Sequence, residues 1–160
     1  MRQITIADEI WIATALLQRE HPNRSEFTVE EIKEHVRRQA LAGGLRAGLD
    51  PHIRQHCVAN RPPNPARLRI LYATGTRTRR LFRPGDPFDP GRARGRAVPA
   101  EEDVPAQYRY LLTWYHDEYT ATSDGRQQPD PILALRGVGK EIWGGEHPDS
   151  YVQRLREGWE

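Results

Sequence analysis

The chain has 160 residues, of which 37% are hydrophobic and 29% are charged, with a formal net charge of +2. This length accommodates one ordinary domain with appendages or two small domains, and the single cysteine, Cys57, excludes an internal disulfide and a multi-cysteine zinc site. No apolar run approaches the roughly 18 residues of a membrane span, and the start of the chain lacks the apolar core of a signal peptide, so we expect a cytoplasmic protein.

The charge is unevenly distributed along the chain. Residues 51–99 contain eleven arginines and two acidic residues, whereas residues 1–50 are close to neutral and residues 100–160 are acidic. A basic block of this kind is typical of proteins that bind the phosphate backbone of nucleic acid. The structural alternative is a solvated basic surface without a ligand.

Two amphipathic helices are expected in the first fifty residues. Residues 4–20 carry one apolar stripe, formed by Ile6, Ile10, Ala13 and Leu17. Thr5 and Asp8 can cap the start of this helix, and His21 ends it. The second helix follows Thr28, which has the capping-box spacing with Glu31. Its buried stripe comprises Val29, Ile32 and Val36.

A third helix is expected from Asp50 to Arg61. Asp50 suits the N-cap and Pro51 the first helical position. Ile53 and Cys57 are four residues apart and should face the core. Cys57 is therefore predicted to be a buried apolar residue rather than a reactive thiol.

A β-hairpin follows the third helix in the sequence. Residues 66–72 alternate charged and apolar side chains, residues 74–77 form a turn, and residues 79–83 form the returning strand. The predicted fold class is α+β and mainly helical, with three helices and a two-stranded hairpin in residues 1–86. This is the order of a winged helix-turn-helix domain, in which the third helix enters the major groove.

The rest of the chain divides into four further segments. Residues 87–104 have the composition of a basic Pro/Gly/Arg linker, residues 105–119 form a C-terminal helical extension, and residues 120–131 form a second linker. The helix carries an aromatic and aliphatic stripe that we interpret as packing surface. Residues 132–160 form a short acidic tail expected to dock on its own domain or on a partner. The apolar anchors of this tail are Ile142, Trp143, Tyr151, Leu155 and Trp159.

Two stretches resemble known proteins. Residues 27–86, with HIRQHCVANRPPNPARLRILYATG and RRLFRPGD, resemble winged-helix modules that occur alone or attached to restriction endonucleases and other prokaryotic defence proteins. That resemblance implies binding to double-stranded DNA, with four candidate base-contacting residues on the third helix, His52, Arg54, Gln55 and Asn60. The candidate DNA-binding residues are His52, Arg54, Gln55, Asn60, Arg61, Arg67, Arg69, Arg77, Arg79, Arg80 and Arg83.

The tail has a second resemblance. Residues 137–143 (GVGKEIW) and 149–156 (DSYVQRLR) resemble the C-terminal segments of bacterial antitoxins from toxin–antitoxin pairs. In those proteins the tail wraps a toxin, so the resemblance implies a toxin as the partner.

Three sequence patterns could indicate a catalytic, metal-binding or phosphate-binding site, but in each case a required feature is missing or a residue has a structural role. Glu31 and Lys33 have the acid-x-lysine spacing of nuclease metal sites, but Glu31 belongs to a helix cap. His52 and His56 lie four residues apart without a third metal ligand nearby. The GVGK run lacks the spacing of a phosphate-binding loop. We therefore expect a protein that is not an enzyme and has no metal or cofactor.

The sequence predicts a sequence-specific DNA-binding protein, a prokaryotic transcriptional regulator or an antitoxin whose acidic tail binds a partner protein. One alternative is a subunit that recruits a restriction or defence effector to DNA. Another is a protein-interaction module that does not bind nucleic acid.

Overall fold

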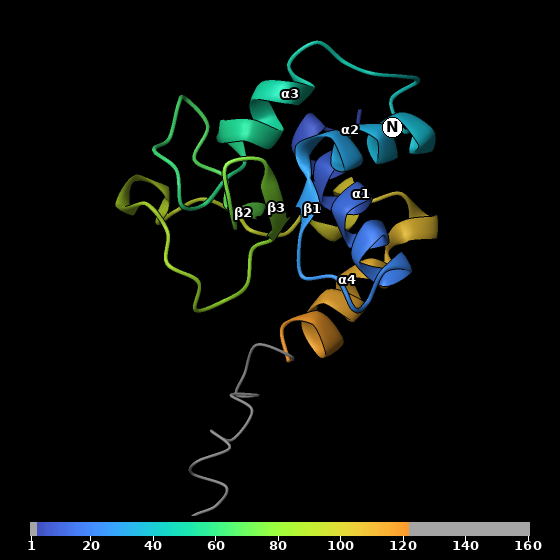
Figure 1. Cartoon of the computed structure of the whole chain (residues 1–160). Helices are drawn as coiled ribbons and strands as arrows, with labels where there is room; N and C mark the ends of the chain where they lie inside the picture. Colours follow the sequence, from blue (N-terminus) through green and yellow to red (C-terminus); the bar gives the residue numbers. More distant parts are fainter. Residues whose placement is uncertain (1–2, 122–160) are drawn as a thin grey trace, which may run out of the picture. The chain divides into compact units, whose positions relative to one another are not determined.

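The structure, a computed structural model, describes residues 3–121. The described part is α+β and mainly helical, with one small three-stranded antiparallel sheet (Figure 1). Its principal elements, in chain order, are α1 (Ile6–Glu20), β1 (Phe27–Thr28), α2 (Val29–Gln39), α3 (Leu49–Pro51), η1 (His52–His56), β2 (Leu71–Ala73), β3 (Thr78–Leu81), α4 (Tyr110–Trp114) and η5 (Tyr115–Tyr119).

The starts of α1 and α2 are confirmed as predicted. The Asp8 amide donates to the Thr5 hydroxyl over 3.2 Å at the start of α1. At the start of α2, the Glu31 amide donates to Thr28 Oγ1 over 3.1 Å, and the Thr28 amide donates to Glu31 Oε2 over 2.8 Å. This reciprocal pair is the capping box. The helix ends at Gln39, because Ala40 adopts the left-handed conformation with a φ of 45°.

The third helix is shorter than predicted. It begins at Leu49 after Gly48, whose φ is 95°, so Asp50 is not its N-cap. The single α turn continues into the π-type turn η1, which ends at His56. The chain then leaves the helix because Val58 forms a parallel bridge with Leu71 of β2. The expected continuation to Arg61 is therefore wrong.

The sheet contains the predicted hairpin and one additional strand. Its order is β1-β3-β2, with Leu71 opposite Leu81 and Phe27 opposite Arg79. β2 begins at Leu71, later than the strand predicted from residue 66. β1 has only two residues and was not predicted.

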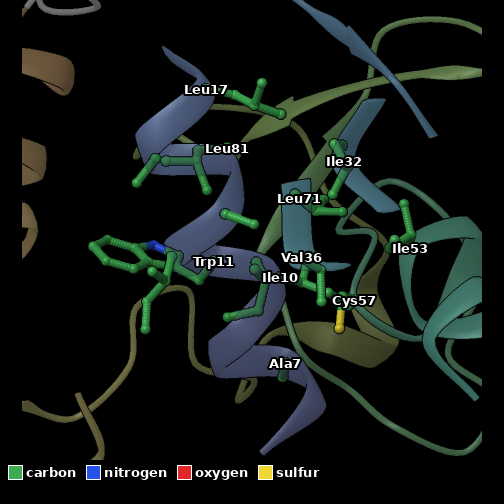
Figure 2. Packing of buried hydrophobic residues seen from close by; sticks show 14 of the residues in the cluster. Ala7, Ile10, Trp11, Leu17, Ile32, Val36, Ile53, Cys57, Leu71 and Leu81 are labelled. Atoms are coloured by element: carbon green, nitrogen blue, oxygen red, sulfur yellow. The ribbon is translucent and has the colours of Figure 1, made fainter. Parts of the chain in front are cut away.

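The hydrophobic core lies between α1, α2, η1 and the sheet, as Figure 2 shows. Ile10, Trp11 and Ile53 are completely buried. Cys57 is also buried, as predicted, and burial raises the pKa of its thiol to about 12. A thiol with this pKa is neutral at physiological pH and unreactive.

The segment after residue 86 is not an extended linker. Arg92 is completely buried, and Val104 belongs to the hydrophobic core. The helical extension packs against the same core through Leu111, Tyr115 and Tyr119, which confirms its stripe as packing surface. The Tyr119 hydroxyl donates to the Leu81 carbonyl over 2.9 Å. The predicted boundary at residue 86 therefore does not end the packed unit.

The remaining predictions for the C-terminal part lie outside the described residues. This applies to nearly all of the linker at 120–131 and to the whole tail, including Ile142, Trp143, Tyr151, Leu155 and Trp159. Among the helices of residues 3–121, none has the length and apolar character needed to cross a membrane.

Candidate nucleic-acid interface

The candidate site lies where η1 meets the turn between β2 and β3. η1 carries Arg54 and Gln55, and the turn carries Arg77. A hollow of about 240 Å³ is lined by side chains from the start of α2, from η1 and from the turn. Its lining residues are Thr28, Val29, Glu30, Arg54 and Arg77. Two arginines from elements that are distant in sequence therefore come together here.

Arg79 is the buried link between these elements. Its side chain donates to the carbonyls of Ile53 and Arg54 in η1, over 3.2 and 3.3 Å. It also donates to the carbonyls of Gly75 and Thr78 in the hairpin, over 3.0 and 2.7 Å. Burial, together with the nearby positive charges of two other arginines, lowers the pKa of its guanidinium to about 10. At 1% exposure Arg79 cannot contact a phosphate, so its assignment to the DNA surface is wrong.

The four candidate base-contacting residues have different environments. The Asn60 side-chain amide bonds both the N–H and the carbonyl of Ala73 over 2.9 Å, which places it in a structural role beside β2. His52 Nδ1 lies 2.7 Å from the Gly48 carbonyl oxygen, and Gln55 donates to the Pro62 carbonyl over 3.4 Å. Arg54 is exposed and forms ion pairs. His52, Gln55 and Asn60 thus contact backbone groups, whereas Arg54 is exposed and held by carboxylates.

Three further predicted arginines are held by the protein itself. Arg80 pairs with Asp86 over 2.6 and 2.7 Å, and only 14% of its side chain is exposed. Arg69 donates to the Gly95 carbonyl over 2.9 Å and lies over aromatic rings. The Arg83 guanidinium lies 4.4 Å from the ring centroid of Tyr119. A phosphate would have to displace these contacts, which makes the three residues weaker candidates.

Four arginines of the basic block have no ion pair, side-chain hydrogen bond or aromatic-ring contact with any residue within 3–121. Three of them, Arg61, Arg67 and Arg77, were predicted DNA contacts, and the fourth, Arg94, was assigned to the linker. The backbone of Gly95, the residue after Arg94, packs so closely on the Arg67 carbonyl that a Cβ at position 95 would clash with it. The repeated arginines of the GRARGR run could have indicated that Arg94 is a further candidate for the basic surface.

The other two arginines of the basic block have structural partners. Arg92 donates to five backbone carbonyls, at distances of 2.6 to 3.2 Å. Arg96 forms an ion pair of 2.8 Å with the buried Asp8. The basic surface is therefore smaller than the sequence indicates, because much of the positive charge is used inside the protein.

The residues considered for catalysis and metal binding also have local partners. Glu31 pairs with Arg24 over 2.7 Å, and this contact lowers the pKa of Glu31 to about 2. The rings of His52 and His56 lie 4.9 Å apart, edge to face. Over the described range, no three His, Cys, Asp or Glu side chains come together in a group that could hold a metal ion.

No family model, curated protein or solved structure matches this chain. The candidate site has three features. These are a set of arginines without partners in the described range, a hollow between two helices and a turn, and a buried cation beneath them.

Proposed function

We propose that residues 3–121 form a winged helix-turn-helix domain that binds double-stranded DNA. The order α1–β1–α2–α3–β2–β3 supports this proposal, because winged-helix domains place a helix pair before a hairpin. In this arrangement α2 and α3 with η1 are the helix-turn-helix pair, and residues 74–77 are the wing. η1 enters the major groove and the wing follows the phosphate backbone.

The observation that carries the proposal is the unneutralised positive charge where η1 meets the wing. Arg79 is buried against four carbonyls, with no carboxylate among its hydrogen-bond partners in the described residues. Arg61 is close enough to affect the pKa of Arg79, and Arg77 lines the adjoining hollow. Positive charge concentrated at a helix and a turn attracts a polyanion.

In this proposal, different residues make the phosphate contacts and the base contacts. Arg61, Arg67, Arg77 and Arg94 contact phosphates and set affinity, because such contacts carry no sequence information. Arg54 and Gln55 contact base edges and set specificity. Asn60 and Arg79 support the site from within, through their bonds to β2 and to η1.

The salt dependence of binding tests this proposal. Four phosphate contacts release about four counterions, so the slope of log affinity against log salt should be about −3.6 for duplex DNA. The measurement is fluorescence anisotropy with a labelled 30-base-pair duplex over a range of salt concentrations. Absence of binding at low salt, or a slope near zero, would contradict the proposal.

A matched pair of variants locates the interface. Arg77→Ala should weaken binding and reduce the magnitude of the slope by about 0.9. Arg37→Ala removes an exposed arginine of α2 that pairs with Glu34, and it should leave the slope unchanged. An equal effect of both substitutions would indicate a general charge effect instead of an interface at the wing.

The acidic tail extends the proposal to a partner protein. We propose that the chain is a prokaryotic transcriptional regulator or antitoxin whose tail binds a toxin, or else a subunit that recruits a defence effector to DNA. Co-expression with the product of the adjacent gene separates these possibilities. A small toxin that co-purifies supports the first, and a nuclease or methyltransferase supports the second.

One observation favours a second candidate, an interaction module without nucleic-acid binding. α3 and η1 together span only residues 49–56, and Asn60, expected on this helix, is bonded to the backbone of β2. A helix this short presents few side chains to a groove. Binding of a protein partner together with no DNA binding at low salt would support this candidate.

A further inference from the structure

A closed ring of four charges connects α2 to the helix proposed to enter the major groove. Lys33 Nζ lies 3.2 Å from Glu30 Oε2 and 3.1 Å from Asp50 Oδ1. Arg54 Nε lies 2.5 Å from Asp50 Oδ2, and Arg54 Nη2 lies 3.6 Å from Glu30 Oε1. Positive and negative groups alternate around this ring, so its net charge is zero.

The ring lies on the surface beside the hollow. Its side chains are 29% to 70% exposed, with Glu30 the most exposed member. Glu30 and Arg54 both line the hollow, together with Arg77. Exposed ion pairs contribute little to stability, so this ring can open without unfolding the domain.

The ring also determines what Arg54 can do in the absence of DNA. Its guanidinium is held by Asp50 and lies near Glu30, and these contacts raise the pKa of Arg54, while the contact with Arg54 lowers that of Asp50. A phosphate that approaches the hollow therefore meets the Glu30 carboxylate as well as two arginines, one of which, Arg54, is also held by Asp50. The carboxylates compete with the phosphate for Arg54 and repel it.

We propose that Asp50 and Glu30 suppress non-specific DNA binding by holding Arg54 until a matching DNA site offers it a better acceptor. This inference rests on the proposed DNA-binding function. A guanine edge can accept two hydrogen bonds from Arg54 and replace the carboxylates, whereas an arbitrary sequence cannot. Asp50 and Glu30 are thus specificity-determining residues.

Asp50→Asn and Glu30→Gln test the proposal with a 20-base-pair duplex of scrambled sequence as the probe. Release of Arg54 adds one phosphate contact, so Asp50→Asn should bind this duplex roughly tenfold more tightly at about 50 mM salt. The salt slope should become steeper by about 0.9. Glu30→Gln should act in the same direction, and its high exposure makes misfolding no concern.

Glu34→Gln is the matched control. It removes one negative charge from the same helix, but Glu34 pairs with Arg37 and belongs to no contact with Arg54. It should change affinity much less than Asp50→Asn. The double variant Asp50→Asn with Arg54→Ala should lose the gain, because the released group is then absent.

The possible outcomes distinguish failure of this proposal from failure of the DNA-binding function on which it rests. If the wild-type protein binds the duplex and Asp50→Asn binds it no better, the ring only joins the two helices and the proposal is wrong. An equal gain from Glu34→Gln would also overturn it, since net charge alone would explain the effect. If the wild-type protein binds no DNA at low salt, the proposed function itself fails.

Discussion

Arg77 and Arg79 lie two residues apart on one hairpin and have opposite environments. Arg77 is exposed, with no ion pair or side-chain hydrogen bond in the described part of the chain. Arg79 is buried and donates to four backbone carbonyls. The sequence composition does not distinguish these two residues, but Arg77 is available to a ligand and Arg79 supports the fold.

Replacement of Arg79 by alanine should destabilise the domain strongly. The substitution removes a buried side chain and its hydrogen bonds to four backbone carbonyls, of which the bond to Ile53 is buried, so we expect the free energy of unfolding to fall by about 3 kcal/mol. Arg77→Ala serves as the control and should change it by less than about 0.5 kcal/mol. Urea denaturation followed by circular dichroism measures both values. Equal midpoints for the two variants would contradict the structural role of Arg79.

The burial of Arg79 could have been predicted, whereas the role of Asn60 could not. In a strand, residues two apart share a face, and Leu81 faces the core. Arg79 therefore had to point inward as well. Asn60 bonds to Ala73, thirteen residues away, and no local pattern indicates such a contact.

At the scale of elements, capped helix starts were predictable and helix ends were less so. A capping box depends on residues within one turn, which is why Thr28 and Glu31 located the start of α2. The end of η1 depends on pairing between Val58 and Leu71, which is a contact between distant residues. The two-residue strand β1 is likewise defined by its partner β3 rather than by its own sequence.

The packing of the segment after β3 likewise depends on contacts between distant residues. Five prolines in residues 84–105 and the GRARGR run indicate a linker by composition. Arg92 instead anchors the segment in the interior through five carbonyls from residues 55–68. A buried arginine with only backbone partners leaves no signal in the local sequence pattern.

The capping box of α2 makes stability depend on pH in the acidic range. Bonds from Arg24 and Thr28 lower the pKa of Glu31 to about 2, from an ordinary value of 4.5. Its stabilising contribution is therefore complete above pH 4.5 and is lost as the pH falls toward 2. Glu31→Gln should lower stability at pH 7 and flatten the acid limb of the stability profile.

Thermal melting between pH 2 and 7 measures this effect. Glu34→Gln removes a carboxylate from the same helix that is not part of the cap, and it should preserve the wild-type acid limb. An acid limb unchanged in Glu31→Gln would show that other carboxylates control acid unfolding.

For the whole molecule, the packed unit extends well beyond the predicted boundary at residue 86. Val104, Leu111, Tyr115 and Tyr119 belong to the same hydrophobic cluster as α1 and the sheet. The tyrosine hydroxyls donate to carbonyls of residues 81 and 82, which fixes the C-terminal helical segment against β3. A protein truncated near residue 86 would therefore lack part of its core.

Two truncations test this extent. Removal of residues 124–160 should leave thermal stability nearly unchanged, because the hydrophobic cluster of the described residues is retained. DNA affinity should change little, since the removed segment carries a net charge of only −2. Removal of residues 105–160 should destabilise the domain severely through loss of three buried side chains.

Differential scanning calorimetry and DNA titration compare the two truncated proteins. The shorter deletion should also abolish co-purification with the proposed partner of the tail. Unfolding of the protein truncated at residue 123 would show that the tail contributes to the core, and the proposal of a tail that binds a partner would lose its support.

The contacts of Arg92 connect the abundance of arginine with the abundance of proline. Each of the thirteen prolines lacks an amide N–H, so proline-rich loops contain more carbonyl acceptors than backbone donors. The five N–H groups of a guanidinium can supply the missing donors. Arg92 donates to the carbonyls of Arg61, Pro62 and Leu68 in the loop around Pro62 and Pro63, and also to two carbonyls of η1. Lysine, with three donors at a single point, could not satisfy such a dispersed set of acceptors, so hydrogen-bond balance favours arginine over lysine at residue 92.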